Sequence, residues 1–110
     1  MSAIESQDPP ILFFSLPLFN RGRNTTVRRG RKWHAVAAAR LRLGDGSLSP
    51  PVRLQTELKQ FPALTETDLR FEHDPACRTV DGLLRVLQRI YPGFDAEEEV
   101  TLCHFDFDGG

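Results

Sequence analysis

The chain has 110 residues, a formal net charge of −1 and 40% hydrophobic residues, which suits a single folded domain with its own core. Its two cysteines, Cys77 and Cys103, show no metal-ligand spacing, so we expect reduced thiols, no metal and no cofactor. Residues 1–10 lack the basic start of a signal peptide, and the apolar run 11–16 is too short to cross a membrane. We therefore expect a cytoplasmic protein that is a monomer and binds no membrane.

Positive charge is concentrated in residues 21–32, RGRNTTVRRGRK, which hold six Arg and Lys side chains and no Asp or Glu. Residues 1–60 carry ten basic and four acidic side chains, a net of +6, whereas residues 61–110 carry four basic and eleven acidic ones, a net of −7. Such a local cluster of like charges is typical of a surface that binds an anionic partner, such as a phosphate backbone. A solvated loop of arginines is the alternative.

The first half of the chain is predicted to form short strands. Residues 11–15 are apolar and aromatic, and residues 39–43 lead into a Gly-Asp-Gly turn. Residues 52–59 alternate apolar and polar side chains throughout, the clearest strand pattern in the chain. Residues 25–28 are rich in β-branched side chains, and alternation places Asn24, Thr26 and Arg28 on one face of that strand.

Helices are predicted in the second half. Residues 65–71 begin with capping and acidic side chains, and a longer helix starts at Thr79, carries an apolar stripe at helical spacing and stops at Pro92-Gly93. Residues 100–107 alternate as a final strand. We therefore expect an α+β fold, a small mixed β-barrel of five or six strands with two or three short helices. The domain would span 11–107, between an N-terminal tail (1–10) and a C-terminal tail (108–110).

The sequence contains neither the glycine-rich phosphate loop of nucleotide triphosphatases nor a nucleophile elbow around any Ser or Thr. Trp33 directly follows the basic run. An exposed aromatic side chain beside arginines suits stacking on an unpaired base. The alternative is that Trp33 plugs one end of the barrel.

The order of these features resembles the ASCH domain family, whose fold is a PUA-like β-barrel. The resemblance covers most of residues 11–107 and lies in an aromatic first strand, a basic second strand, a Leu-Thr-x-x-Asp-Leu turn, a Tyr-Pro helix end and a closing strand. The matching residues are Phe13-Phe14, Gly22 to Arg28, Leu64-Thr65 through Asp68-Leu69, Leu83-Leu84 with Leu87, Tyr91-Pro92, and Val100 to Phe105.

The resemblance implies recognition of RNA or a nucleoside. Some small ASCH proteins remove the acetyl group from N4-acetylcytidine, using a Lys and a Thr of the basic strand and a Glu before the long helix. Thr26 falls on the threonine, and the lysine falls on Arg23, or on Asn24 if the glycines are aligned. Residues 74–78 contain no Glu, so Glu72 is the nearest candidate. Arginine stays protonated and cannot act as a base, so the catalytic set is incomplete.

These features favour a domain that binds RNA or a modified nucleoside in a basic cleft. We expect Asn24, Thr26 and Arg28 to line the pocket, with Arg28 also able to join Arg29, Arg31, Lys32 and Trp33 on the RNA. The first alternative is an amidohydrolase of the N4-acetylcytidine type that uses Thr26, Arg23 and Glu72. The second is a non-enzymatic protein interaction domain that uses the C-terminal Gly109-Gly110 or the acidic second half of the chain.

Overall fold

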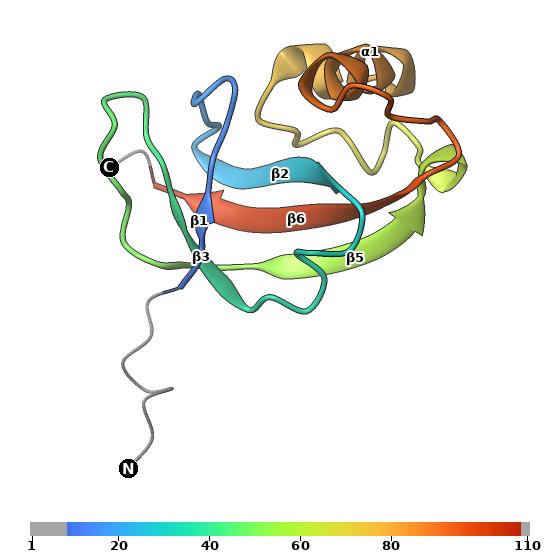
Figure 1. Cartoon of the computed structure of the whole chain (residues 1–110). Coiled ribbons are helices and arrows are strands. Elements are labelled where there is room, and N and C mark those ends of the chain that lie inside the picture. The colour runs from blue at the N-terminus through green and yellow to red at the C-terminus, as the bar shows by residue number, and fades with distance from the viewer. Residues whose placement is uncertain (1–8, 109–110) are drawn as a thin grey trace.

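The computed structural model describes residues 9–108 (Figure 1). Within this range the chain forms six strands, two 3-10 helices and one α-helix. In chain order these are β1 (Ile11–Leu12), β2 (Gly22–Arg29), β3 (Ala38–Leu41), β4 (Val52–Arg53), β5 (Gln55–Gln60), η2 (Phe61–Ala63), η3 (Pro75–Cys77), α1 (Val80–Ile90) and β6 (Glu99–Phe107). No helix among the described residues has the length and apolar character needed to cross a membrane. Residues 109–110, and most of the expected N-terminal tail, lie outside the described residues.

The expected closed barrel is wrong. The described strands form two separate sheets of three, ordered β1-β3-β4 and β2-β6-β5. In the larger sheet β6 is central and antiparallel to both neighbours, while β1 runs parallel to β3 in the smaller one. A barrel requires the hydrogen-bond ladder to continue around all strands. Here β2 and β5 are the edge strands of their sheet, so one side of β2 has no neighbouring strand in the sheet.

Strand β6 separates two hydrophobic clusters because its side chains alternate in direction. Val100 and Leu102 belong to a cluster with α1, whereas Phe105 belongs to a cluster with strands of the smaller sheet. All three are buried. The predicted alternation of this strand is confirmed. It places α1 on one side of the larger sheet and the β1–β3 pair on the other, as Figure 1 shows.

Helix α1 is the element whose predicted limits agree best with the structure. Thr79 caps its first turn by accepting a hydrogen bond from the Gly82 amide, 3.1 Å from the threonine hydroxyl oxygen. Leu83, Val86 and Leu87 are buried against the sheet. The helix ends at Ile90, just before Pro92-Gly93, as predicted. Its C-terminal turn brings Tyr91 close to β2.

Two local predictions differ from the structure. Residues 65–71 do not form an α-helix; they form hydrogen-bonded turns, in which the amides of Asp68 and Leu69 each bond to a carbonyl three residues earlier. The strand expected over 52–59 is interrupted at Leu54, whose amide donates to the Ala37 carbonyl. Leu54 is buried with the smaller sheet, and this divides the segment into β4 and β5.

Candidate functional site: a cavity beside strand β2

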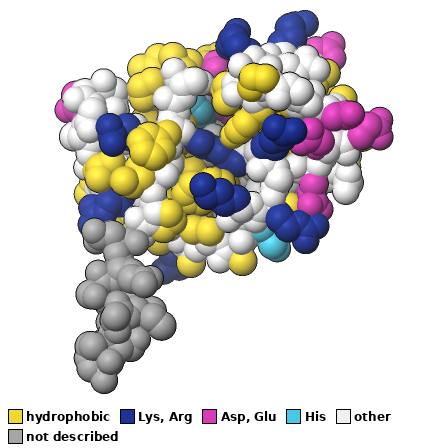
Figure 2. All heavy atoms as spheres, viewed as in Figure 1, with side chains coloured by type: hydrophobic (Ala, Val, Ile, Leu, Met, Phe, Trp, Pro, Cys, Tyr) yellow, Lys and Arg dark blue, Asp and Glu magenta, His cyan; other side chains and the backbone are white. Residues whose placement is uncertain are grey.

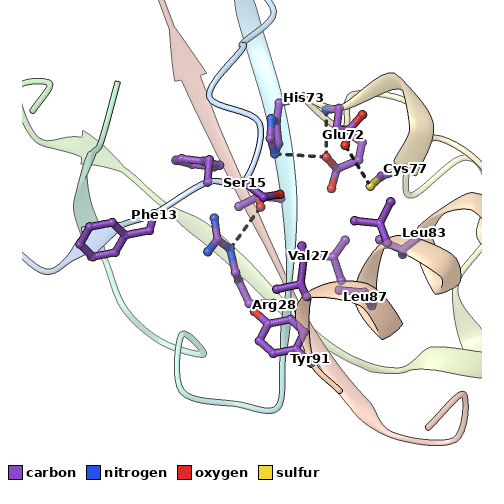
Figure 3. Close-up of a pocket in the computed structure, with 15 residues that line it drawn as sticks. Phe13, Ser15, Val27, Arg28, Glu72, His73, Cys77, Leu83, Leu87 and Tyr91 are labelled. Atoms are coloured by element: carbon purple, nitrogen blue, oxygen red, sulfur yellow. Dashed lines mark hydrogen bonds and ion pairs between the residues drawn. The ribbon is translucent and has the colours of Figure 1, made fainter. Parts of the chain in front are cut away.

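A cavity of about 340 Å³ opens beside β2, between α1 and the segment that follows β1. Its floor is apolar, and polar groups converge on it from three parts of the chain (Figure 3). Its volume lies at the lower end of the range for small-molecule sites. The lining residues are Phe13, Phe14, Ser15, Thr26, Val27, Arg28, Glu72, His73, Asp74, Cys77, Leu83, Val86, Leu87, Ile90 and Tyr91.

The cavity exists because the segment around residues 71–73 covers only part of the free edge of β2. The Thr25 amide donates to the Phe71 carbonyl at 2.9 Å, and the His73 amide donates to the Thr25 carbonyl at 3.1 Å. After His73 the chain turns away into η3. Because strand residues repeat their direction every second position, the Val27 peptide group also faces this edge. The uncovered edge around Val27 is therefore one wall of the cavity.

Arg28, on β2, is a charged side chain that lines the cavity on this side. Its Nε donates to the Thr26 hydroxyl at 3.2 Å, and its guanidinium carbon lies 4.8 Å from the centre of the Phe14 ring. Burial lowers the pKa of Arg28, while Tyr91 raises it; the guanidinium nevertheless stays protonated. Within residues 9–108 no carboxylate oxygen lies within 4.0 Å of its nitrogens. The cavity thus contains a cation that is oriented but not neutralised.

Glu72 is the carboxyl group at the opposite end of the cavity, and only 2% of its surface is exposed. Burial raises its pKa to about 8, although the amides of Asp74 and Val27 and the charge of Arg28 oppose this change. The Asp74 amide donates to Glu72 Oε1 at 3.1 Å. At neutral pH Glu72 is therefore mostly protonated, and it can both donate and accept a hydrogen bond.

His73 is the partner of Glu72. Its Nδ1 lies 3.0 Å from the Leu18 carbonyl oxygen, which can only accept, so Nδ1 carries a proton. Burial lowers the pKa of the ring, so Nε2 is unprotonated at neutral pH. Glu72 Oε1 lies 3.5 Å from Nε2. Since both groups are neutral, this contact is a carboxylic acid facing an imidazole rather than an ion pair.

Of the residues that the sequence pointed to, Thr26, Arg28 and Glu72 line the same cavity. Asn24 does not: it is fully buried, and its side chain bonds the backbone of Asn20 and Gly22 to close the turn before β2. Arg23 does not reach the cavity either. Its Nη1 donates to Gln55 Oε1 at 3.0 Å, across β6 from the cavity edge.

The basic residues at the end of β2 and in the loop that follows are largely paired with acids. Arg29 forms a two-point contact with Glu98, at 2.6 and 2.8 Å, and Arg31 binds Glu99 at 2.7 and 2.8 Å. Lys32 is exposed and forms no ion pair within residues 9–108. Figure 2 shows Arg and Lys side chains dispersed over the visible face of the molecule, several beside acidic ones, rather than gathered in one patch. The charge asymmetry of the sequence is therefore reduced in the fold.

Trp33 is half-buried and packs against the cluster of the smaller sheet. It does not line the cavity. The aromatic side chains that do are Phe13, Phe14 and Tyr91, and Figure 3 shows Tyr91 beside Arg28, whereas Phe13 points away from the helix. Sequence reasoning treated Phe14 as a strand residue and Tyr91 mainly as a helix end. One feature of the sequence could have indicated Tyr91. The resemblance to ASCH domains combines the Tyr-Pro helix end with the basic strand.

A second polar chain crosses the larger sheet without forming a nucleophilic site. Thr25 Oγ1 lies 2.9 Å from His104 Nδ1, and His104 Nε2 lies 3.1 Å from Glu57 Oε1. The order hydroxyl–imidazole–carboxylate matches that of a catalytic triad. However, Thr25 is only 1% exposed, and it lines neither the cavity beside β2 nor the small hollow that His104 lines. A substrate cannot reach its hydroxyl, so this chain is structural.

Comparisons of the chain with protein-family models, with curated proteins and with solved structures gave no match.

Proposed function

We propose that this cavity binds a modified nucleoside, either free or as an unpaired residue of RNA. The observation that carries the proposal is the position of Arg28, held by Thr26 and Phe14 without a carboxylate partner inside a cavity of nucleoside size. Phe14 and Tyr91 give the cavity an aromatic lining against which a base can pack. The neutral Glu72 can donate and accept at the base's polar edge. The similarity to ASCH domains, a cytoplasmic location and a monomeric state remain predictions.

Isothermal titration of the protein with cytidine and with N4-acetylcytidine tests this proposal. We expect saturable binding of at least one of them, and about tenfold weaker binding by Phe14→Leu, because base–aromatic stacking contributes roughly 1–3 kcal/mol. Phe71→Leu is the matched control, since Phe71 is an exposed aromatic side chain outside the cavity. Absence of saturable binding by the unaltered protein, or equal losses in the two variants, would contradict the proposal.

An amidohydrolase acting on N4-acetylcytidine is the second candidate function. It is favoured by the presence of a hydroxyl, Thr26, and a carboxyl of raised pKa, Glu72, in one cavity. Water would be consumed, and cytidine and acetate would be released. If ionised Glu72 is the proton acceptor, the rate is half-maximal near pH 8, where half of this group is ionised, and levels off at higher pH.

Acetate release from N4-acetylcytidine, followed with pH, measures this activity. We expect Thr26→Val to lose it, because valine keeps the shape of threonine without the hydroxyl, and Thr67→Val, at an exposed position outside the cavity, to retain it. Acetate release no faster than in buffer alone would exclude the second candidate without affecting the binding proposal.

A further inference from the structure

The arginines near the cavity and in the basic run differ in the groups that accept their hydrogen bonds. Arg29 and Arg31 each bind a carboxylate through two oxygens. Arg78 donates to the Glu72 carbonyl and to Asn20 Oδ1. By contrast, Arg28 donates through Nε to the Thr26 hydroxyl, lies beside Tyr91, and forms no ion pair with a carboxylate within residues 9–108. Guanidinium groups present paired donors that match phosphate and carboxylate oxygens.

The two carboxyl groups of the cavity are engaged elsewhere. Glu72 accepts a hydrogen bond from the Asp74 amide. The side chain of Asp74 accepts from the Ala76 amide at 2.9 Å and lies 3.8 Å from the Cys77 sulfur. Both groups are thus held at the η3 end, and neither comes within 4.0 Å of a nitrogen of Arg28. The anion that would satisfy Arg28 is therefore absent from residues 9–108.

The surroundings of Arg28 also fix its direction. The Phe14 ring covers one face of the guanidinium, and Phe14 is itself packed against Phe19 and His73, with ring centres 4.9 Å apart in each case. Stacking on an aromatic face leaves the in-plane N–H groups free to bind a ligand. Arg28 is thus oriented before any ligand arrives, which reduces the entropy lost on binding.

We infer that the ligand carries a phosphate group bound by Arg28, so that the cavity takes a nucleoside monophosphate in preference to the nucleoside. This inference rests on the proposed function and adds the chemical class of the ligand. The base would lie toward Phe14 and Glu72, and the phosphate would occupy the open side beside Arg28. The same group could belong to a free nucleotide or to the backbone of an RNA, and the test separates these two sources.

Isothermal titrations with cytidine, cytidine 5′-monophosphate, inorganic phosphate and a cytidine trinucleotide provide the test. We expect the monophosphate to bind at least tenfold more tightly than cytidine, and inorganic phosphate to bind more weakly than either. In Arg28→Gln this tenfold preference is expected to disappear, so that the monophosphate binds no more tightly than cytidine. Arg85→Gln, an exposed arginine of α1 outside the cavity, should retain it. A trinucleotide that binds more tightly than the monophosphate assigns the phosphate to RNA, and the reverse order assigns it to a free nucleotide.

Equal affinity for cytidine and its monophosphate would overturn this inference and leave the proposed function standing. Binding of neither cytidine nor its monophosphate would overturn this inference, and it would overturn the proposed function as well if N4-acetylcytidine also fails to bind. A preference for the monophosphate that survives in Arg28→Gln would overturn the assignment to Arg28. Thermal unfolding of Arg28→Gln, compared with the unaltered protein, verifies that the variant is folded. If it is unfolded, Arg28→Lys replaces it. Lysine keeps the charge but loses the paired donors, so this variant is expected to retain only part of the preference for the monophosphate.

Discussion

Replacing Gly82 with alanine is expected to destabilise the protein by roughly 2–4 kcal/mol, in the range of severe overpacking. A Cβ at this position would lie inside contact distance of the Ala76 carbonyl oxygen and 2.9 Å from the Thr79 hydroxyl oxygen. Both are fixed parts of the structure, because Thr79 caps α1 and Ala76 belongs to η3. The helix would have to move away from η3 and disturb the packing of Leu83 against the sheet.

The expected destabilisation is opposite in sign to the effect of helix propensity. Helix propensity alone predicts that Gly82→Ala stabilises a helix by up to about 1 kcal/mol. Gly44→Ala is the matched control, since a Cβ there meets only ordinary contacts, the nearest 3.8 Å away at Pro17. Urea unfolding of both variants measures the free energy of unfolding. A neutral or stabilising Gly82→Ala would show that α1 and η3 are not packed as described.

Glu72→Gln is expected to make the stability of the protein less sensitive to alkaline pH. A glutamate in the unfolded chain ionises around pH 4.5, whereas folded Glu72 keeps its proton until about pH 8. Between these values the folded state binds more protons than the unfolded state, so the free energy of unfolding falls as the pH rises. The decline ends above about pH 8. Glutamine has no proton to lose and escapes this penalty.

Urea unfolding at pH 5 and at pH 8 measures the difference. One pKa unit corresponds to about 1.4 kcal/mol, so we expect Glu72→Gln to gain roughly 2–4 kcal/mol relative to the unaltered protein between these pH values. Glu66→Gln serves as the control, because Glu66 is exposed and lies outside the cavity. Parallel pH profiles for the unaltered protein and Glu72→Gln would mean that the buried carboxyl group does not retain its proton.

Elements set by local periodicity could be predicted from the sequence. The apolar spacing after Thr79 predicted α1, and the alternation over 100–107 predicted β6 with its two faces. The closed barrel could not be judged in this way, because closure depends on hydrogen bonds between strands distant in sequence. Leu54 is an example. It fits the alternation of residues 52–59, yet its amide donates to the Ala37 carbonyl, and the predicted strand is divided at this residue.

The candidate site shows the same division. Alternation along β2 correctly grouped Thr26 and Arg28, which both line the cavity. The same alternation included Asn24, whose side chain is used by the preceding turn. The approach of Phe14 to Arg28 depends on the course of the chain after β1, which no local pattern records.

The basic run shows how pairing between distant residues changes the meaning of a charge pattern. In the register of β2 with β6, Arg29 lies opposite Val100, and this brings Glu98 and Glu99 beside Arg29 and Arg31. Exposed ion pairs of this kind contribute little to stability, but they reduce the charge offered to a polyanion. Within the basic run, we therefore expect Arg28, and not the loop after β2, to bind the ligand.

Amide chemical shifts of the ¹⁵N-labelled protein, recorded during titration with cytidine 5′-monophosphate, test most directly that the cavity beside β2 is the binding site. We expect saturable shifts concentrated at residues 26–28, 72–74 and 87–91, which come together only at the cavity. The loop at 30–33 should change little. Shifts confined to that loop, or no saturable shift at all, would contradict the assignment of the cavity as a nucleotide site.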